Sequence, residues 1–286
     1  MSTRIGYLGP EATFTHMAVT RFFGSEIMAV PYQTIPDCMD AVAGNEVKFA
    51  VVPLENTIEG SVNLTVDYLV HEQHLYICGE ITAPIAQHLM VNKGNTEKWK
   101  KAEKVYSHPH ALAQCHKYLH TNFRGISLEN APSTGAAARY ASEHFEERIA
   151  VIANEMAASV YNLEIVERDI QDYSHNHTRF VILHPSEDAE PASFESLSSR
   201  EKTTLVITLP SDQSGTLHQV LSAFAWRRLN LSKIESRPRK TGLGNYFFII
   251  DIEQGMDSIL IPGAISELEA LGCGVKLLGS YKAYNL

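Results

Sequence analysis

The chain has 286 residues, 44% of them hydrophobic and 20% charged, with a net charge of -9. This length suggests about two domains, and the composition is that of an ordinary globular protein. The negative charge disfavours binding to nucleic acid or anionic membranes, since the one basic cluster is short, at residues 98–101. No apolar run reaches the roughly 18 residues that a membrane span requires, and we expect no secretory signal.

Cysteine and histidine spacing argues against disulfides and metal sites. The four cysteines, at positions 38, 78, 115 and 273, are far apart and form no C-x-x-C pair. We therefore expect reduced thiols in a cytoplasmic protein. His108 and His110, like His175 and His177, stand two residues apart, but no carboxylate or cysteine follows at a ligand spacing, which disfavours a metal site.

The first 183 residues alternate short apolar runs with helical patterns. Strands are predicted at 5–8, 28–31, 49–53, 77–89, 105–107, 149–152 and 179–183. Helices are predicted at 13–23, 35–43, from about 62, and at 109–120, 133–142 and 156–161. Strands separated by helices indicate an α/β sheet with parallel pairing. The order suggests two lobes, the second at about 79–166, with a ligand cleft between them, as in periplasmic-binding proteins.

A polar stretch rich in Ser, Glu, Pro and Ala, 184–202, separates this part from a different pattern. The tail predicts strands at 203–209, 231–237, 245–252 and 275–284, helices at 215–228 and 258–271, and a turn at 238–244. That order is βαββαβ, a ferredoxin-like domain, whose sheet edges often pair with another copy.

Residues 176–180, Asn-His-Thr-Arg-Phe, run directly into an apolar strand. A Thr beside an Arg at the mouth of a strand can hold and protonate an anionic substrate, because Thr donates one hydrogen bond and Arg offers a planar fork of donors. The same residues also suit an ordinary strand start with a solvated cation and a core aromatic, so the pattern alone leaves both interpretations open.

Other polar segments lie where strands pass into helices. They are residues 53–62, 106–115 and 6–16, with a further helix start at 133–137. Free backbone amides converge at such places and favour anions, although ordinary caps and turns explain the same residues. In the tail, residues 215–221 begin a helix with Gly, and Glu-Ser-Arg-Pro at 235–238 ends a strand. These residues could bind a ligand's carboxylate, because Gly lets it approach the backbone amides, or they could form a tight turn and a salt-bridged strand edge.

These motifs resemble the prephenate dehydratase family, in which a catalytic region precedes an ACT domain that senses phenylalanine. The matching segments are N-x-T-R-F at 176–180, P-x-E-N-T-x-x-G at 53–60, S-H-P followed by Q-C at 107–115, and Y-L-G-P followed by T-F at 7–14. The resemblance covers nearly the whole chain. Departures from the usual pattern are Leu54 for Ile, His110 for Gln, Ala12 for Gly and Thr15 for Ser.

The resemblance implies a role for each matching residue. The catalytic residue would be Thr178, with the guanidinium of Arg179 facing the substrate carboxylates. The substrate-binding residues would be Asn56, Glu55, Thr57, Ser107, Gln114, Arg179, Phe180, Thr13 and Phe14. An allosteric L-phenylalanine site would comprise Gly215, Thr216, Leu217, Glu235, Ser236, Arg237 and Pro238.

The implied fold is a two-lobed, periplasmic-binding-protein-like (type 2) α/β catalytic domain at 1–184, a linker at 185–202 and an ACT domain at 203–286. The first lobe would combine about 1–78 with 167–184. The implied activity is a hydro-lyase that converts prephenate to phenylpyruvate, CO2 and water in phenylalanine biosynthesis, without nucleotide, flavin or metal. We expect a homodimer or homotetramer formed through the ACT domains.

Three other functions are compatible with parts of this pattern. An arogenate dehydratase would use the amino acid analogue of the substrate, and the sequence does not distinguish it. A non-catalytic sensor is disfavoured by the joint presence of Thr178, Asn56, Ser107 and Gln114. A fused chorismate mutase is not expected, because the dehydratase-like strand begins at residue 5.

Overall fold

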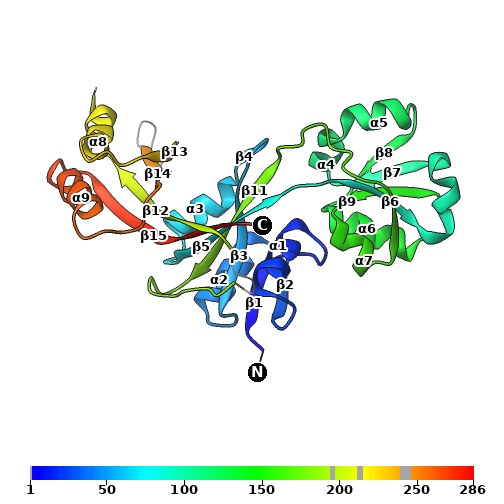
Figure 1. The fold of residues 1–286 in the computed structure, drawn as a ribbon, viewed down its shortest axis with the longest axis horizontal. Helices are drawn as coiled ribbons and strands as arrows, with labels where there is room; N and C mark the ends of the chain where they lie inside the picture. The colour runs from blue at the N-terminus through cyan, green and yellow to red at the C-terminus, as the bar shows by residue number, and fades with distance from the viewer. Residues whose placement is uncertain (1, 194–196, 211–214, 239–245) are drawn as a thin grey trace.

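The computed structural model describes residues 2–193, 197–210, 215–238 and 246–286. Three parts follow one another along the long axis: a C-terminal region, called the ACT region after the expectation above, at one end, a first lobe in the middle and a second lobe at the other end (Figure 1). No helix among the described residues has the length and hydrophobicity to cross a membrane.

The first lobe is built on a mixed sheet, not the parallel one that alternating strands and helices predict, because the strand that returns from the second lobe pairs antiparallel with both its neighbours. Its strands are β1 (Arg4–Leu8), β2 (Met28–Tyr32), β3 (Phe49–Asn56), β4 (Gly60–Ser61), β5 (Tyr76–Pro84) and β11 (His177–His184). β1 pairs in parallel with β2 and β3, and β11 is antiparallel between β3 and β5. Three helices belong to this lobe: α1 (Phe14–Phe23), α2 (Ile35–Ala43) and α3 (Asn63–His71).

The second lobe has its own sheet, in the order β10-β6-β9-β7-β8 among the described residues. The strands are β6 (His88–Asn92), β7 (Lys104–Ser107), β8 (Ser127–Asn130), β9 (Ile149–Ala153) and β10 (Leu163–Glu167). The helices are α4 (Pro109–Gln114), α5 (His116–Asn122), α6 (Thr134–Glu143), α7 (Glu155–Val160) and the 3-10 segment η1 (Lys93–Lys101). The single helix expected at 109–120 is divided at Cys115, whose backbone leaves helical geometry at φ -111° and ψ 19°.

Two crossings join the lobes, as predicted, and they are bonded to each other. Ile85 N donates to Asn176 O at 2.9 Å, and Ile170 N donates to Gln87 O at 2.9 Å. The border differs from the expected position near residue 79, because β5 stays paired with β11 as far as Pro84. The predicted strand at 77–89 is therefore two strands, one in each lobe.

The ACT region has the predicted βαββαβ order: β12 (Ser199–Thr208), α8 (Thr216–Ala225), β13 (Leu231–Pro238), β14 (Tyr246–Ile252), α9 (Leu260–Ala270) and β15 (Gly274–Asn285). β12 begins inside the linker expected at 185–202, because its first residues pair with the end of β15. The turn predicted at 238–244 lies, apart from Pro238, outside the described residues.

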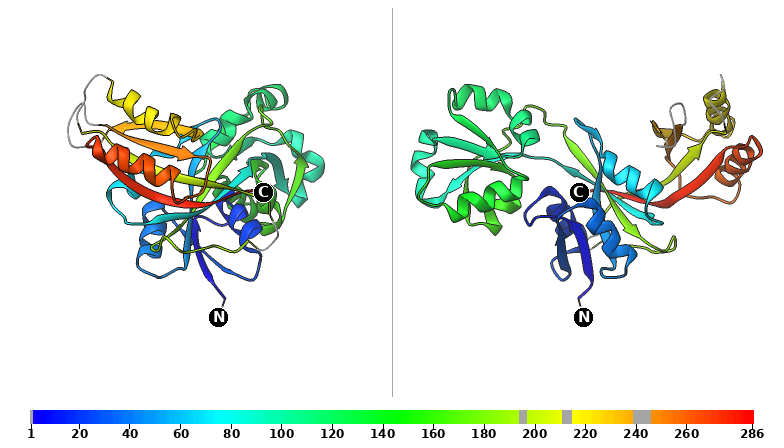
Figure 2. Two further views of the ribbon diagram at one scale, coloured as in Figure 1. Left: turned by 60° about the vertical axis from the view of Figure 1, so that its left-hand side comes forward. Right: turned by 180° about the vertical axis from the view of Figure 1, so that it is seen from behind.

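The ACT sheet is continuous with the first lobe, which the sequence does not predict. β15 pairs in parallel with β5 from Lys282–Gly79 to Asn285–Thr82. The close approach requires Gly279, where a Cβ would meet Ile77 O at 2.0 Å. One face of the ACT sheet packs under α8 and α9, and the other face packs against α3 of the first lobe (Figure 2). The C-terminal domain and the first lobe thus share one continuous sheet.

Candidate active site

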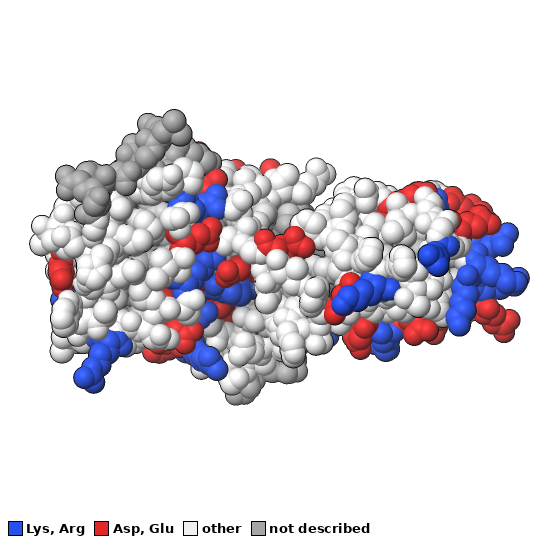
Figure 3. Space-filling view, turned by 90° about the horizontal axis from the view of Figure 1, so that it is seen from above, with Lys and Arg blue, Asp and Glu red and all other residues white. Residues whose placement is uncertain are grey.

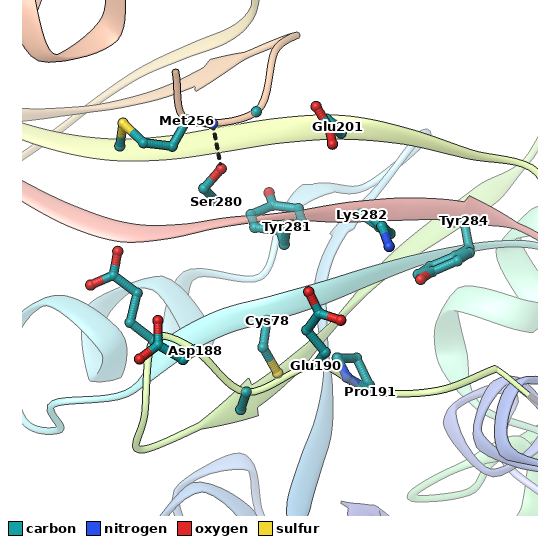
Figure 4. Close-up of a pocket in the computed structure, with 13 residues that line it drawn as sticks. Cys78, Asp188, Glu190, Pro191, Glu201, Met256, Ser280, Tyr281, Lys282 and Tyr284 are labelled. Carbon is teal, nitrogen blue, oxygen red and sulfur yellow. Dashed lines mark hydrogen bonds between the residues drawn. The ribbon is translucent and has the colours of Figure 1, made fainter. Parts of the chain in front are cut away.

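Two sizeable cavities lie next to the first lobe, and their chemistry differs. One, of about 480 Å3, lies beside the junction of β5 and β15, where Asp188, Glu190 and Glu201 surround Tyr281 and Tyr284 (Figure 4). Lys282 is the one cation among its lining residues, so this acidic cavity would repel an anion. The other, of about 640 Å3, opens between the two lobes. It is the candidate active site.

The cleft collects the ends of several elements. Its wall includes the following predicted residues: Thr13, Phe14, Asn56, Gln114, Thr178 and Phe180. Thr13 accepts a hydrogen bond from His16 N and so caps α1. From the other lobe, Ser133 caps α6 by accepting from Ala136 N at 3.0 Å. Two helix N-termini therefore meet the cleft from opposite lobes, which favours bound carboxylates.

Thr178 and Asn56 form the polar centre of the first-lobe wall. They lie opposite each other on β11 and β3, and Asn56 Nδ2 donates to Thr178 Oγ1 at 2.9 Å. Asn56 Oδ1 accepts from Ile58 N and Glu59 N, which fixes the amide orientation. Because the Thr178 oxygen is an acceptor here, its own proton is free to be donated, and no described residue accepts it. The pair thus presents one O–H donor.

Gln87 is a cleft residue that the sequence reasoning missed. It lies on the crossing between β5 and β6, is 2% exposed, and donates from Nε2 to Gln114 Oε1 at 3.3 Å. Its own Oε1 has no hydrogen-bond partner among the described residues. A buried acceptor without a donor is unfavourable until a ligand supplies one. No sequence signal marks Gln87, since the apolar content of residues 77–89 predicts one continuous strand.

Four predicted binding residues lie outside the cleft wall. Ser107 is fully buried and donates to Ile152 O at 2.6 Å, so it holds β7 against β9. Thr57 is bonded to the backbone of His177, at 3.0 Å as donor and 3.2 Å as acceptor. Glu55 and Arg179 bind each other, at 2.6 Å, on the opposite face of the sheet from Thr178. Arg179 was expected to face the substrate carboxylates in the cleft, but it faces the other side of the sheet.

The basic side chains of the cleft wall are His108 and His110; among the described lining residues there is no Lys or Arg. Burial lowers the pKa of His108, and the neighbouring His110 lowers it further, so His108 is neutral near pH 7. His110 Nδ1 lies 3.9 Å from Glu59 Oε2 across the cleft. On the face in Figure 3, basic and acidic side chains are intermingled without a continuous basic surface.

The predicted effector segments lie at two places in the ACT region. Gly215, in left-handed geometry at φ 90°, precedes Thr216 and Leu217 at the start of α8. Glu235, Ser236, Arg237 and Pro238 form the end of β13. Arg237 is paired with Glu235 at 3.2 Å and with Asp67 of α3 at 2.9 Å, so this segment touches the catalytic part.

Comparison with known proteins identifies the family to which the chain belongs. The family profile "Prephenate dehydratase" matches residues 5–188. The chain belongs to the prephenate dehydratase family. A second profile, "ACT domain", matches residues 203–271. Over 284 residues, 99% of this chain and 100% of the relative, the chain is 62% identical to prephenate dehydratase of Bacillus subtilis (strain 168).

Solved structures agree in fold. The crystal structure of prephenate dehydratase from Arthrobacter aurescens in complex with L-Phe superposes with a TM-score of 0.84 at 29% identity, covering 98% of this chain and 90% of that one. The enzyme from Staphylococcus aureus subsp. aureus Mu50 gives a TM-score of 0.81 at 30% identity, covering 98% and 100%. The two-lobed catalytic fold with a C-terminal ACT domain, expected from the motifs, is confirmed.

Proposed function

We propose that this chain is a prephenate dehydratase that supplies phenylpyruvate for L-phenylalanine biosynthesis. The observation that carries the proposal is the Asn56–Thr178 pair, with a free hydroxyl proton, in the cleft of a chain 62% identical to a curated prephenate dehydratase. The reaction is one elimination: the bond from the ring to the departing carboxylate breaks, its electrons enter the ring, and the C4 hydroxyl leaves. One proton converts the departing hydroxide to water.

The chain's own groups supply positioning and one hydrogen bond. Thr178 donates to the departing oxygen, so charge that develops there meets a fixed donor. Its hydroxyl is a poor acid, so it stabilises the leaving group or relays a proton without staying ionised. Gln87 Oε1, buried and without a donor, would accept a hydrogen bond from the substrate, whose only donor is the ring hydroxyl. Aromatisation provides the driving force, and the proposal includes no cofactor.

The two substrate carboxylates would lie at the N-termini of α1 and α6, beside Thr13 and Ser133, with Gln114 as a further donor. Phe14 and Phe180 would contact the ring. Glu55 and Thr57 would act on the site indirectly, by holding the strand ends that carry Asn56 and Thr178. Ser107 would do so in the second lobe, by holding β7 against β9.

The regulatory proposal concerns the ACT region. L-Phenylalanine would bind at Gly215–Leu217 and Glu235–Pro238 and change the activity of the cleft. The crystal structure of the Arthrobacter enzyme in complex with L-Phe and the ACT profile match support this effector. Assembly as a homodimer or homotetramer through ACT domains is supported by β13, which has no outer strand neighbour among the described residues. The four buried free cysteines favour the cytoplasm.

A direct assay tests the function. Purified protein is incubated with prephenate, and phenylpyruvate is measured by its absorbance, with and without L-phenylalanine. We expect turnover on prephenate and a changed rate with phenylalanine. Parallel incubation with arogenate separates the two dehydratase activities. No phenylpyruvate from prephenate would contradict the proposal.

A further inference from the structure

Arg179 points away from the cleft because of its place in a strand. It stands between Thr178 and Phe180, which both line the cleft, and successive side chains of a strand face opposite sides of the sheet. Its side chain is 17% exposed. Nη1 contacts Glu55 at 2.6 Å, and Nη2 contacts both Glu80 at 2.6 Å and Asp251 at 2.7 Å. The guanidinium is therefore engaged by protein carboxylates.

The surrounding charges are balanced without a ligand. Lys202 of β12 contacts Glu80 at 2.9 Å, and Lys233 of β13 contacts Glu55 at 3.1 Å. Three cations thus alternate with three carboxylates: Arg179, Lys202 and Lys233 with Glu55, Glu80 and Asp251. We call these six residues the junction cluster. A substrate carboxylate at Arg179 would have to displace one of its members.

The junction cluster lies directly behind the catalytic pair. Thr178 is the register partner of Asn56, and Arg179 is the partner of Glu55. The Arg179–Glu55 ion pair therefore ties together, on one face, the same two strand ends that the Asn56–Thr178 hydrogen bond joins on the other. The β11–β3 register shifts between Arg179 and Phe180, an irregularity of the kind found beside active sites. A displaced guanidinium would displace the Thr178 hydroxyl.

The other side of the junction cluster belongs to the ACT sheet. Asp251 of β14 accepts a hydrogen bond from Thr204 of β12 at 2.8 Å, and Thr204 in turn contacts the Tyr281 hydroxyl of β15 at 2.8 Å. Asp251 is 1% exposed. Its carboxylate is thus held by ACT strands while its other oxygen holds Arg179.

A second contact reaches the cleft wall from β13. Ser61, which lines the cleft, accepts from Lys233 Nζ at 2.6 Å and donates to Glu235 at 2.5 Å. Glu235 belongs to the predicted effector segment. Both the strand behind Thr178 and the loop beside Asn56 are therefore anchored to ACT residues.

We propose that Arg179 is a positioning residue: it acts through Thr178 and Asn56, not on the substrate, and it makes their geometry depend on the ACT sheet. This rests on the proposed dehydratase function. Movement of β13 or β14 relative to the first lobe changes the direction of the Thr178 hydroxyl. Since misplacement of a catalytic group by about 1 Å can cost about a hundredfold in rate, small shifts of the ACT sheet suffice.

The test compares Asp251→Asn and Arg179→Lys, singly and together, by kcat and KM for prephenate. Asp251 lies in the ACT sheet, outside the cleft wall. We expect each single variant to lose about ten- to a hundredfold in kcat with KM within about threefold. The double variant should lose little more than Arg179→Lys alone, because both act through one contact. Glu267→Gln is the matched control: it removes a carboxylate partner of Arg227, paired at 2.6 Å within the ACT region, and should leave kcat unchanged.

Three results would overturn the proposal: wild-type kcat in Asp251→Asn, a KM rise of about tenfold confined to Arg179→Lys, or losses that multiply in the double variant. If Asp251→Asn does not fold, Thr204→Val replaces it, since it removes the hydrogen bond that orients Asp251, together with the contact to the Tyr281 hydroxyl, and should lower kcat in the same way. A wild-type enzyme without turnover contradicts the proposed function instead. In that case the unfolding free energies of Asp251→Asn, Arg179→Lys and the double variant test the coupling. If the losses of the two single variants add up in the double variant, Arg179 and Asp251 are not coupled.

Discussion

Alternation along β11 determines which residues of the T-R-F motif meet the substrate. Thr178 and Phe180 face the cleft, and Arg179 faces the junction cluster. The wall that remains is poor in charge, so a dianion depends on helix termini, amide groups and the Thr178 hydroxyl. Hydrogen bonds from such preorganised groups stabilise developing charge without reorganisation.

Ionised Glu80 stabilises the fold, and this stabilisation is lost at acid pH. Burial alone would raise its pKa, but Arg179 and Lys202 outweigh burial and hold the pKa below the usual value of 4.5. Because the folded-state pKa is lowered, the stabilisation is present above the unfolded pKa and is lost as pH falls through the folded one. Glu80→Gln should lower the unfolding free energy by about 3 kcal/mol at pH 7, since it leaves Arg179 and Lys202, two cations of intermediate burial, underpaired.

Urea unfolding at several pH values between 7 and 3 measures this effect. The difference between wild type and Glu80→Gln should shrink below pH 4.5 as the wild-type carboxylate becomes protonated. Glu129→Gln is the control, because its pair with Lys104 is exposed and 3.8 Å long, and it should change stability by less than about 1 kcal/mol. A constant difference at all pH values would contradict the assignment.

At the scale of elements, the start of α6 must lie against the turn before α1 for both helix termini to reach the cleft. Gly135 allows this contact, because a Cβ there would meet Glu11 O at 2.4 Å. Asn154 reinforces it by donating to Ala12 O at 2.8 Å. The lobes are thus in direct contact at this point.

We expect Gly135→Ala to push the α6 terminus away and to lower kcat/KM for prephenate by at least about tenfold, with about 1–3 kcal/mol lost in stability from overpacking. Gly94→Ala is the matched control, since nothing lies within 4 Å of its Cβ position. Steady-state kinetics and thermal unfolding measure both effects. Equal kinetics for the two variants would show that the contact is not needed.

Most helices and strands were predictable, because buried strands are short runs of apolar residues and the helices carry apolar residues spaced three and four apart. The T-R-F segment and the P-x-E-N loop also gave Thr178 and Asn56, which the structure brings together. The side on which Arg179 lies follows from the alternation of side chains along β11. Its partner Asp251 could not be predicted, because it lies on β14, far away in the sequence. Such non-local contacts leave no local pattern, and the same holds for the β15–β5 pairing and for Gln87.

For the whole molecule, the continuous sheet makes the sensor and the first lobe one unit, leaving β13 at the outer edge. Ile234 lies on β13 and is 47% exposed. An edge strand with one free side and an exposed apolar side chain favours pairing with a second copy.

Ile234→Glu should therefore shift a dimer or tetramer toward the monomer, because it places a charge in the proposed interface. Light scattering after size-exclusion chromatography measures the mass. Val160→Glu, on the second lobe and 43% exposed, is the control and should not alter the mass. A monomeric wild type, or an unchanged mass for Ile234→Glu, would contradict assembly through this edge.

The most direct test of the catalytic account is the turnover number of Thr178→Val beside Thr178→Ser, with prephenate at saturation. Valine keeps the shape and removes the hydroxyl, whereas serine keeps the donor. We predict a loss of about two to four decades in kcat for valine and less than about one decade for serine. Wild-type turnover in a folded Thr178→Val enzyme would show that the reaction does not use this hydroxyl.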